Sequence, residues 1–430
     1  MRPETASLIA LDKKHSWHPF TQMQDWCAPE NEPLVLVSGE GATLRDSEGR
    51  TYLDGNSSIW TNIHGHRHPK ITAAIRDQLD RVAHVSFLGT TNEPATRLSE
   101  RLLALFPPST LERVFYSDDG STAIEVALKL SLQYWQLTDH PEKRRFIAFD
   151  NAYHGDTTGA ASLGGVSTFT NRFAAINFPT QHIASVDDLA AREDQAHQIA
   201  GIVIEPLVQG AAGIRLWPAG MLKKLRTWCD QHRVHLIFDE VLTGFGRTGK
   251  MFACQHEDVL PDFLCLAKAL TGGYLPLAAT LTTARIYNAF LGDYADLKTF
   301  FYGHSYCGNP LGCAAGLASL DIFEEEKTLA NLAPKIALLR ELLAELKSHP
   351  NVHDIRQCGF IAGIEVGQAN GDPYPWELKT GIRICEAAKA HGLLTRPVLN
   401  TIVLMPPFCI TEQELRKAAN ALRAAIDEVC

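Results

Sequence analysis

Between about residues 66 and 310, short apolar runs alternate with helical stretches, and this pattern limits the fold more than any other feature of the chain. The runs predicted as strands are Arg113–Tyr116, Arg145–Phe149, Gly201–Ile204, His235–Phe238 and Phe263–Leu266. Apolar strands separated by helices are typical of a mostly parallel sheet with helices on its faces. We therefore predict an α/β fold with one large, mostly parallel sheet.

The two ends of the chain have a different pattern. Near the N-terminus, Leu34–Val37 and Ala42–Leu44 alternate as short antiparallel strands do. Beyond about residue 320, amphipathic helices flank short strands; the helices are predicted at Leu329–Lys347, Leu378–His391 and Glu412–Val429, and the strands near Gly359–Val366 and Ile402–Leu404. We predict an N-terminal arm (1–65) that joins a small α+β domain (321–430), and a large α/β domain (66–320) between them.

Composition excludes several classes of protein. The 430 residues suffice for more than one domain, and a net charge of −9 gives no basic surface for nucleic acid. No apolar run is long enough to span a membrane, and the N-terminus lacks the apolar stretch of a signal peptide. Ten scattered cysteines without metal-ligand spacing indicate reduced thiols, and hence the cytoplasm. The histidines of His64–His68 lack carboxylate or thiolate neighbours in the sequence, so we predict a loop and the start of a helix there rather than a metal site.

Each predicted strand is followed by chemically useful side chains. In strand order these are Ser117–Thr122, Asn151–Asp156, Glu205, Asp239 and Lys268. The carboxyl ends of parallel strands meet at one edge of a sheet, where ligands of open α/β folds bind. Any one of these groups would be weak evidence. Five at one edge predict a ligand site.

Asp239 and Lys268 are the most informative pair in this set. A lysine can form a Schiff base with pyridoxal phosphate, and a carboxylate can keep the pyridine nitrogen protonated. The alternative for Asp239 is a helix cap at a strand end. The alternative for Lys268 is a solvated lysine, which fits poorly with the apolar stretch LCLAKAL around it.

Gly120 and Ser121 open a predicted helix with the apolar face Ile124, Ala127, Leu128 and Trp135. Such a helix start can bind phosphate, although an ordinary cap is the alternative. Val241 lies two residues after Asp239, so on an extended segment both would face one side. We expect Val241 to cover one face of the cofactor ring and Tyr153 the other, unless Tyr153 is a core aromatic residue.

These residues and their context resemble the class III aminotransferases of fold type I, and the resemblance covers nearly the whole chain. The stretches that carry it are WHPFTQM (17–23), DGNSSIWTNIHGHRHP (54–69), DNAYHGDTTGA (150–160), FDEVLTGFGRTGKMFACQHE (238–257), LAKALTGGYLPLAAT (266–280) and GHSYCGNPLGCAA (303–315). It is closest to the biotin-pathway branch, which aminates 8-amino-7-oxononanoate to 7,8-diaminononanoate. It implies pyridoxal 5'-phosphate as cofactor, with Lys268, Asp239 and Tyr153 as the catalytic residues.

The resemblance also implies residues that bind the substrate and a partner subunit. Tyr153 and Arg396 match residues that contact the keto acid, and a guanidinium suits its carboxylate tail. Gly303, Phe20 and Ile59 match other pocket positions. The position of Ser305 reaches the phosphate of the neighbouring subunit in that family, which implies a homodimer with shared sites.

Several positions bear on the amino donor. Glutamate-linked relatives carry an arginine where this chain has Val403, and a glutamate where it has Ala211, so glutamate is not expected. Members that use S-adenosylmethionine carry a tyrosine and a tryptophan where this chain has Phe20 and Ile59. A lysine-using branch shares the forms found here. The donor is therefore S-adenosylmethionine or L-lysine, with neutral drift at both positions as the alternative.

Three other functions stay open at this point. An ω-amino acid:pyruvate transaminase and an aminomutase of the glutamate-semialdehyde kind share the fold. A catalytically silent binding protein is the third, and the complete set of Lys268, Asp239 and Tyr153 argues against it. Arg247 is expected either to anchor a loop or to help bind substrate.

Overall fold

The computed structural model describes all residues from 1 to 430, and a seven-stranded sheet forms its centre. The strand order is β4 (Arg113–Ser117), β12 (Ala278–Thr282), β11 (Phe263–Leu266), β10 (His235–Asp239), β7 (Ile199–Ile204), β5 (Arg145–Phe149) and β6 (Gln181–Ile183). From β11 to β6 every pair is parallel, whereas β12 pairs antiparallel with both β11 and β4. The predicted mostly parallel α/β sheet is confirmed. Strands β6 and β12 are not among the strands predicted from the sequence.

A long helix with an apolar face and a defined start packs against the central strands of the sheet. Helix α6 (Gly120–Leu137) buries Ile124, Ala127, Leu128 and Trp135, the face that the sequence predicts. Asp119 caps it: its carboxylate accepts from the Thr122 N–H at 2.9 Å, and the Thr122 hydroxyl in turn accepts from the Asp119 N–H at 3.0 Å. This cap fixes where α6 begins, directly after β4. The remaining helices before residue 327 are α1 (Pro3–His15), α2 (Met23–Cys27), α3 (Ser57–Trp60), α4 (Pro69–Arg81), α5 (Glu93–Leu103), α7 (Thr158–Ser162), α8 (Ser167–Thr170), α9 (Met221–His232), α10 (Ala284–Ala289) and α11 (Pro310–Glu325).

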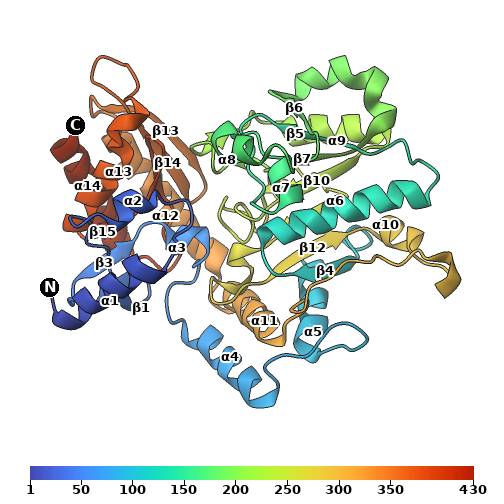
Figure 1. Cartoon of the computed structure of the whole chain (residues 1–430), viewed down its shortest axis with the longest axis horizontal. Helices are drawn as coiled ribbons and strands as arrows, with labels where there is room; N and C mark the ends of the chain where they lie inside the picture. The colour runs from blue at the N-terminus through green and yellow to red at the C-terminus, as the bar shows by residue number, and fades with distance from the viewer.

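The N-terminal and C-terminal segments lie together on one side of the molecule (Figure 1). Strands β1 (Leu36–Glu40), β2 (Thr43–Asp46) and β3 (Thr51–Asp54) form an antiparallel series, and β15 (Leu393–Leu394) adds parallel to β3. The predicted strand at 34–37 was misplaced, because β1 begins two residues later and runs to Glu40. Strand β3 is not among the predicted strands either.

The C-terminal segment forms its own four-stranded sheet, in the order β13 (Val352–Cys358), β14 (Ile361–Val366), β17 (Thr401–Leu404) and β16 (Pro397–Val398). Helices α12 (Thr328–Leu346), α13 (Thr380–Ala390) and α14 (Glu412–Val429) accompany it, within two residues of their predicted bounds. A short two-stranded sheet pairs β8 (Val208–Gln209) with β9 (Arg215–Leu216). The division at residues 65 and 320 stays a prediction. No helix has both the length and the apolar character that crossing a membrane requires.

Candidate active site

A cavity of about 440 Å³ opens at the carboxyl edge of the large sheet. It brings together six of the predicted site residues: Gly120, Ser121, Tyr153, Asp239, Val241 and Lys268. They come from the ends of β4, β5, β10 and β11, in agreement with the prediction that groups after parallel strands converge. Asp118, His154, Glu205 and Trp60 line the same cavity.

Lys268 lies two residues beyond β11, at the start of a 3-10 turn (Lys268–Thr271). Burial lowers the pKa of its amine to about 8, although Asp239 and Glu205 act in the opposite direction. Relative to an ordinary lysine at 10.5, this raises the neutral fraction at pH 7 roughly 300-fold. The neutral amine is the nucleophile, so the environment favours covalent chemistry at Lys268.

Asp239 ends β10, and its buried carboxylate is bound from two sides. The His154 ring nitrogen Nδ1 lies 2.7 Å from its Oδ2, and the Val241 N–H donates to its Oδ1 at 3.1 Å. His154 is itself buried, and its Nε2 has no protein partner. His154 belongs to the predicted site loop Asn151–Asp156, but no role was predicted for this histidine.

Val241 reaches the cavity for a different reason from the one predicted. The strand ends at Asp239, so Asp239 and Val241 are not two residues of one extended segment. The backbone turns instead, and the N–H of Val241 folds back onto the Asp239 carboxylate. The turn sets Val241 against Gly120, where an added Cβ would lie 2.7 Å from the valine Cγ1.

The start of α6 is built to receive an anion. Asp119 caps the Thr122 N–H, which leaves the N–H groups of Gly120 and Ser121 for a ligand. The Ser121 hydroxyl accepts a hydrogen bond from the Asp156 N–H at 3.1 Å. Gly155 packs so close that a Cβ there would lie 2.0 Å from this hydroxyl, and its φ of +118° suits only glycine.

Tyr153 and Glu205 form another wall of the cavity. The Tyr153 hydroxyl donates to Asp156 at 2.6 Å; burial, with this bond, raises the pKa of the phenol above its usual value. Glu205 accepts the N–H groups of Tyr153 at 3.1 Å and Gly210 at 2.8 Å. Burial raises the pKa of Glu205 to about 7.

Five of the predicted substrate or cofactor residues do not line this cavity in the single chain: Phe20, Ile59, Gly303, Ser305 and Arg396. All five are exposed. Phe20 is connected to the cavity through Phe169. The ring centroids of Phe20 and Phe169 are 5.5 Å apart in an edge-on contact, and those of Phe169 and the cavity residue Tyr153 are 5.8 Å apart. Ile59 directly precedes the cavity residue Trp60.

Arg247 lies outside the cavity and is fully buried. Its guanidinium donates to the Pro406 carbonyl at 2.8 Å and lies over the Phe408 ring at 4.9 Å. Of the two expectations for this residue, these contacts match the loop anchor. Burial lowers its pKa to about 9, with Asp54 acting in the opposite direction.

The positions that serve glutamate in related enzymes are apolar here. Ala211 lines the cavity, and Val403 is buried in β17 within a cluster that includes Trp60 and Leu242. No guanidinium stands at Val403 to hold a second carboxylate. Neither side chain can form an ion pair with a second carboxylate of a substrate.

The residues present fit pyridoxal 5'-phosphate in three independent ways. The amine of Lys268 suits its aldehyde, the carboxylate of Asp239 suits its ring nitrogen, and the open N–H groups at Gly120 and Ser121 suit its phosphate. Gly120 and Gly155 are needed around this proposed phosphate site, because an added Cβ would collide with Val241 at position 120 and with Ser121 at position 155.

Comparison with known proteins agrees with this site. The family "Aminotransferase class-III" matches residues 27–426. An adenosylmethionine-8-amino-7-oxononanoate aminotransferase of Geobacter sulfurreducens is 47% identical, over 99% of this chain and 98% of that protein. The chain belongs to the class III aminotransferases.

Two solved structures have the same fold as this chain. The crystal structure of the adenosylmethionine-8-amino-7-oxononanoate aminotransferase of Methanocaldococcus jannaschii is 41% identical, with a TM-score of 0.96 over 99% of both chains. An amine transaminase from an uncultivated Pseudomonas species, solved in its pyridoxal-phosphate-bound form, is 32% identical, with a TM-score of 0.90 over 97% of this chain and 99% of that one. The protein is thus a fold type I, pyridoxal-phosphate-dependent aminotransferase.

Proposed function

We propose that this enzyme transfers an amino group to 8-amino-7-oxononanoate and forms 7,8-diaminononanoate, a step of biotin biosynthesis. The observation that carries the proposal is the likeness along the whole chain to relatives named for this substrate. The apolar Val403 and Ala211 support it, because they remove the site that glutamate-linked enzymes need.

Pyridoxal 5'-phosphate, when bound, supplies an aldehyde for amines and a ring that accepts an electron pair. Lys268 would hold it covalently, then act as the base that moves a proton once its amine is free. Asp239, held by His154, would keep the ring nitrogen protonated. Val241 and Tyr153 would cover the two ring faces, and Gly120 and Ser121 would bind the phosphate.

Arg396 and Ser305 complete the proposed site from outside the cavity. Arg396 follows β15 (Leu393–Leu394) and is exposed, so its guanidinium is free to meet the carboxylate tail of the keto acid. Ser305 is exposed on the segment before α11, together with the neighbouring Phe301 and Tyr306. Large exposed apolar side chains there support a covering partner, and we propose a homodimer in which Ser305 of one subunit serves the phosphate of the other.

The amino donor is proposed to be S-adenosylmethionine or L-lysine. The relatives have adenosylmethionine in their names, which supports S-adenosylmethionine as the donor. Phe20 and Ile59 favour L-lysine, because they offer neither a hydroxyl nor a flat indole to a bulky cationic donor. We place the enzyme in the cytoplasm, from its ten unpaired cysteines.

The main alternative is an ω-amino acid:pyruvate transaminase, because amine transaminases share this fold at about 30% identity. A comparison of two reactions separates them. Purified enzyme should convert 8-amino-7-oxononanoate with an added donor, and Lys268→Ala should abolish this conversion while leaving the protein folded. Pyruvate-dependent turnover of simple diamines, without any conversion of the oxononanoate, would refute the proposal.

A further inference from the structure

The segment Ser57–Trp60 (α3) forms one turn of a left-handed helix. Its four residues have φ values of 46°, 47°, 65° and 72°, and none of them is glycine. In this conformation the Cβ of an L-residue crowds the following carbonyl oxygen, and a β-branched residue such as Ile59 tolerates it worst. Such a turn persists only where its surroundings hold it.

Asp54 holds this turn from its N-terminal side. Its Oδ1 accepts the N–H groups of Asn56 and Ser58, each at 3.2 Å, and its Oδ2 accepts the Ser58 hydroxyl at 3.2 Å. The far end of the turn is tied by Trp60, whose ring N–H donates to the Asn56 side-chain oxygen at 2.9 Å. The carboxylate of Asp54 therefore organises the backbone from residue 56 to residue 58.

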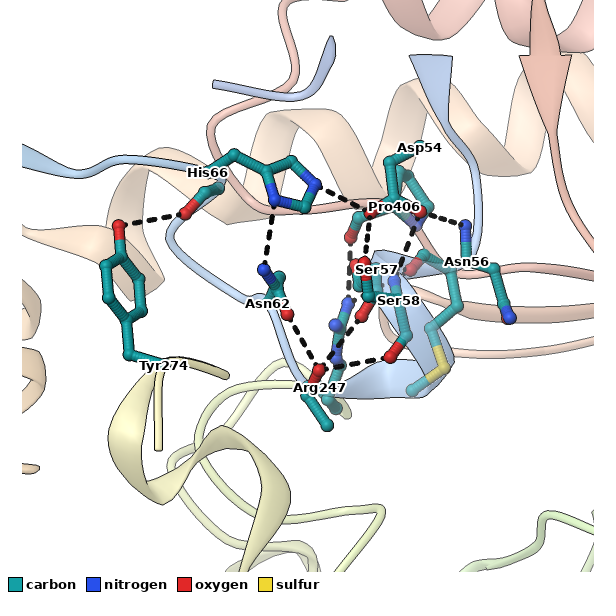
Figure 2. A network of polar contacts seen from close by, with 12 residues as sticks. Asp54, Asn56, Ser57, Ser58, Asn62, His66, Arg247, Tyr274 and Pro406 are labelled. Atoms are coloured by element: carbon teal, nitrogen blue, oxygen red, sulfur yellow. Dashed lines mark hydrogen bonds and ion pairs between the residues drawn. The ribbon is translucent and has the colours of Figure 1, made fainter. Parts of the chain in front are cut away.

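His66 holds Asp54 in turn, as Figure 2 shows. The Thr61 hydroxyl lies 2.7 Å from the Asn62 side-chain oxygen, which leaves the Asn62 NH₂ to donate to His66 Nδ1 at 3.1 Å. The other ring nitrogen, Nε2, lies 2.9 Å from Asp54 Oδ2, so the His66 ring bridges Asn62 and Asp54. Both partners of this bond are largely buried.

The turn sets the Trp60 ring against the reactive amine. The centroid of this ring lies 4.7 Å from Lys268 Nζ, and Trp60 itself is buried. The charged groups that face the same amine are Asp239, Glu205 and Arg247. Trp60 differs from these because it is neutral, and its π face stabilises the ammonium form without adding a charge to the cofactor site.

We propose that Asp54 and His66 are positioning residues of the aminotransferase site: they hold the left-handed turn Ser57–Trp60 and so keep the Trp60 ring against the Lys268 amine. They act through Trp60 and touch neither Lys268 nor the cavity. The proposal rests on the proposed role of Lys268 as the residue that binds the cofactor.

The test follows the state of the Lys268 amine directly. Full-length protein is stripped of cofactor, and the rate at which added pyridoxal 5'-phosphate attaches to Lys268 is measured by absorbance across a pH series. Only the neutral amine attacks, so the rate reports the fraction of deprotonated lysine. Trp60→Leu should lower the pH midpoint of this rate by roughly half to one pH unit, because the ring no longer favours the ammonium.

Asp54→Asn and His66→Gln should lower the midpoint in the same direction, and His66→Gln does so with the Asp54 charge still in place. In the Trp60→Leu background, Asp54→Asn should add no further shift, because both changes remove the same interaction. Asp46→Asn is the matched control: Asp46 is also a buried, multiply bonded aspartate of the N-terminal sheet, bound to Arg50 and Tyr52. It should lower stability and leave the midpoint unchanged.

Two results would overturn the inference. One is a folded Asp54→Asn or His66→Gln protein that keeps the wild-type midpoint. The other is an Asp54→Asn shift that persists in full without the Trp60 ring, because it would then be a direct effect of charge. Should Asp54→Asn fail to fold, His66→Gln alone decides the question. Attachment of the cofactor to another lysine, seen by peptide mapping, would instead refute the role of Lys268 itself.

Discussion

Replacing Lys268 with methionine is expected to abolish transamination and, at the same time, to stabilise the cofactor-free protein. The cause is the cost of holding an ammonium away from water. Burial lowers the pKa of Lys268 from 10.5 to about 8, which corresponds to about 3 kcal/mol at neutral pH. The side chain lines an open cavity, so water there screens part of this cost. We expect a gain of about 1–3 kcal/mol from Lys268→Met at pH 7.

The stability difference between Lys268→Met and wild type should depend on pH. Below pH 8, Lys268 is an ammonium in both the folded and the unfolded protein, so the wild type bears the full cost. Between pH 8 and 10.5 the folded protein loses its proton first, and the cost falls. The stability advantage of Lys268→Met should therefore be constant up to about pH 8 and disappear toward pH 10.5.

Urea denaturation of the cofactor-free proteins, at one fixed protein concentration, measures this difference. Lys143→Met is the matched control. Burial also lowers the pKa of Lys143 to about 8, but its amine donates to the carbonyls of Ala196, Ile199 and His232 at 3.1–3.3 Å. Loss of those bonds should destabilise the protein by about 1–3 kcal/mol. The reasoning is wrong if Lys268→Met is no more stable than wild type at pH 7, or if its advantage does not shrink above pH 8.

Three further predictions concern the proposed active site. Asp239→Asn should lower kcat on the order of a hundredfold or more, because an amide stabilises a protonated ring nitrogen poorly; near-normal steady-state kinetics would remove Asp239 from this role. Relative to wild type, Glu205→Gln should gain up to about 3 kcal/mol of stability between pH 4.5 and pH 8, because burial raises the pKa of Glu205 to about 7 from 4.5; the amide NH₂, which cannot accept the N–H of Tyr153 or Gly210, adds a cost that does not depend on pH. This gain should vanish as the pH falls to about 4.5, and urea titrations at pH 8 and pH 4.5 that give equal differences would contradict it. Phe20→Tyr combined with Ile59→Trp should raise kcat/KM for S-adenosylmethionine relative to L-lysine, and an unchanged ratio would show that neither residue selects the donor.

The sheet and much of the cavity were predictable from sequence because both depend on local patterns. Apolar runs such as His235–Phe238 are long enough to identify buried strands, and the parallel arrangement then fixes where the residues that follow them meet. Lys268, Asp239 and Gly120 converge for this reason. His154 was within reach of the same argument, since it belongs to the loop after β5 and is the kind of side chain that a buried carboxylate binds.

Other features could not be derived because distant parts of the chain impose them. Strand β3 pairs with β15, about 340 residues later, and no local signal announces such a partner. The left-handed turn at Ser57–Trp60 contradicts the backbone preferences of its own residues. It exists because Asp54 binds it on one side and the Met405 carbonyl accepts the Ser57 hydroxyl at 2.7 Å on the other.

Conversion of 8-amino-7-oxononanoate by the purified, cofactor-loaded enzyme is the decisive test of the proposed function. The substrate is supplied with L-lysine in one series and with S-adenosylmethionine in another, and diaminononanoate is quantified in each. We expect product with at least one donor, and product with L-lysine alone would attribute the choice to Phe20 and Ile59. Product with neither donor, from enzyme that carries its cofactor on Lys268, would contradict the proposed function.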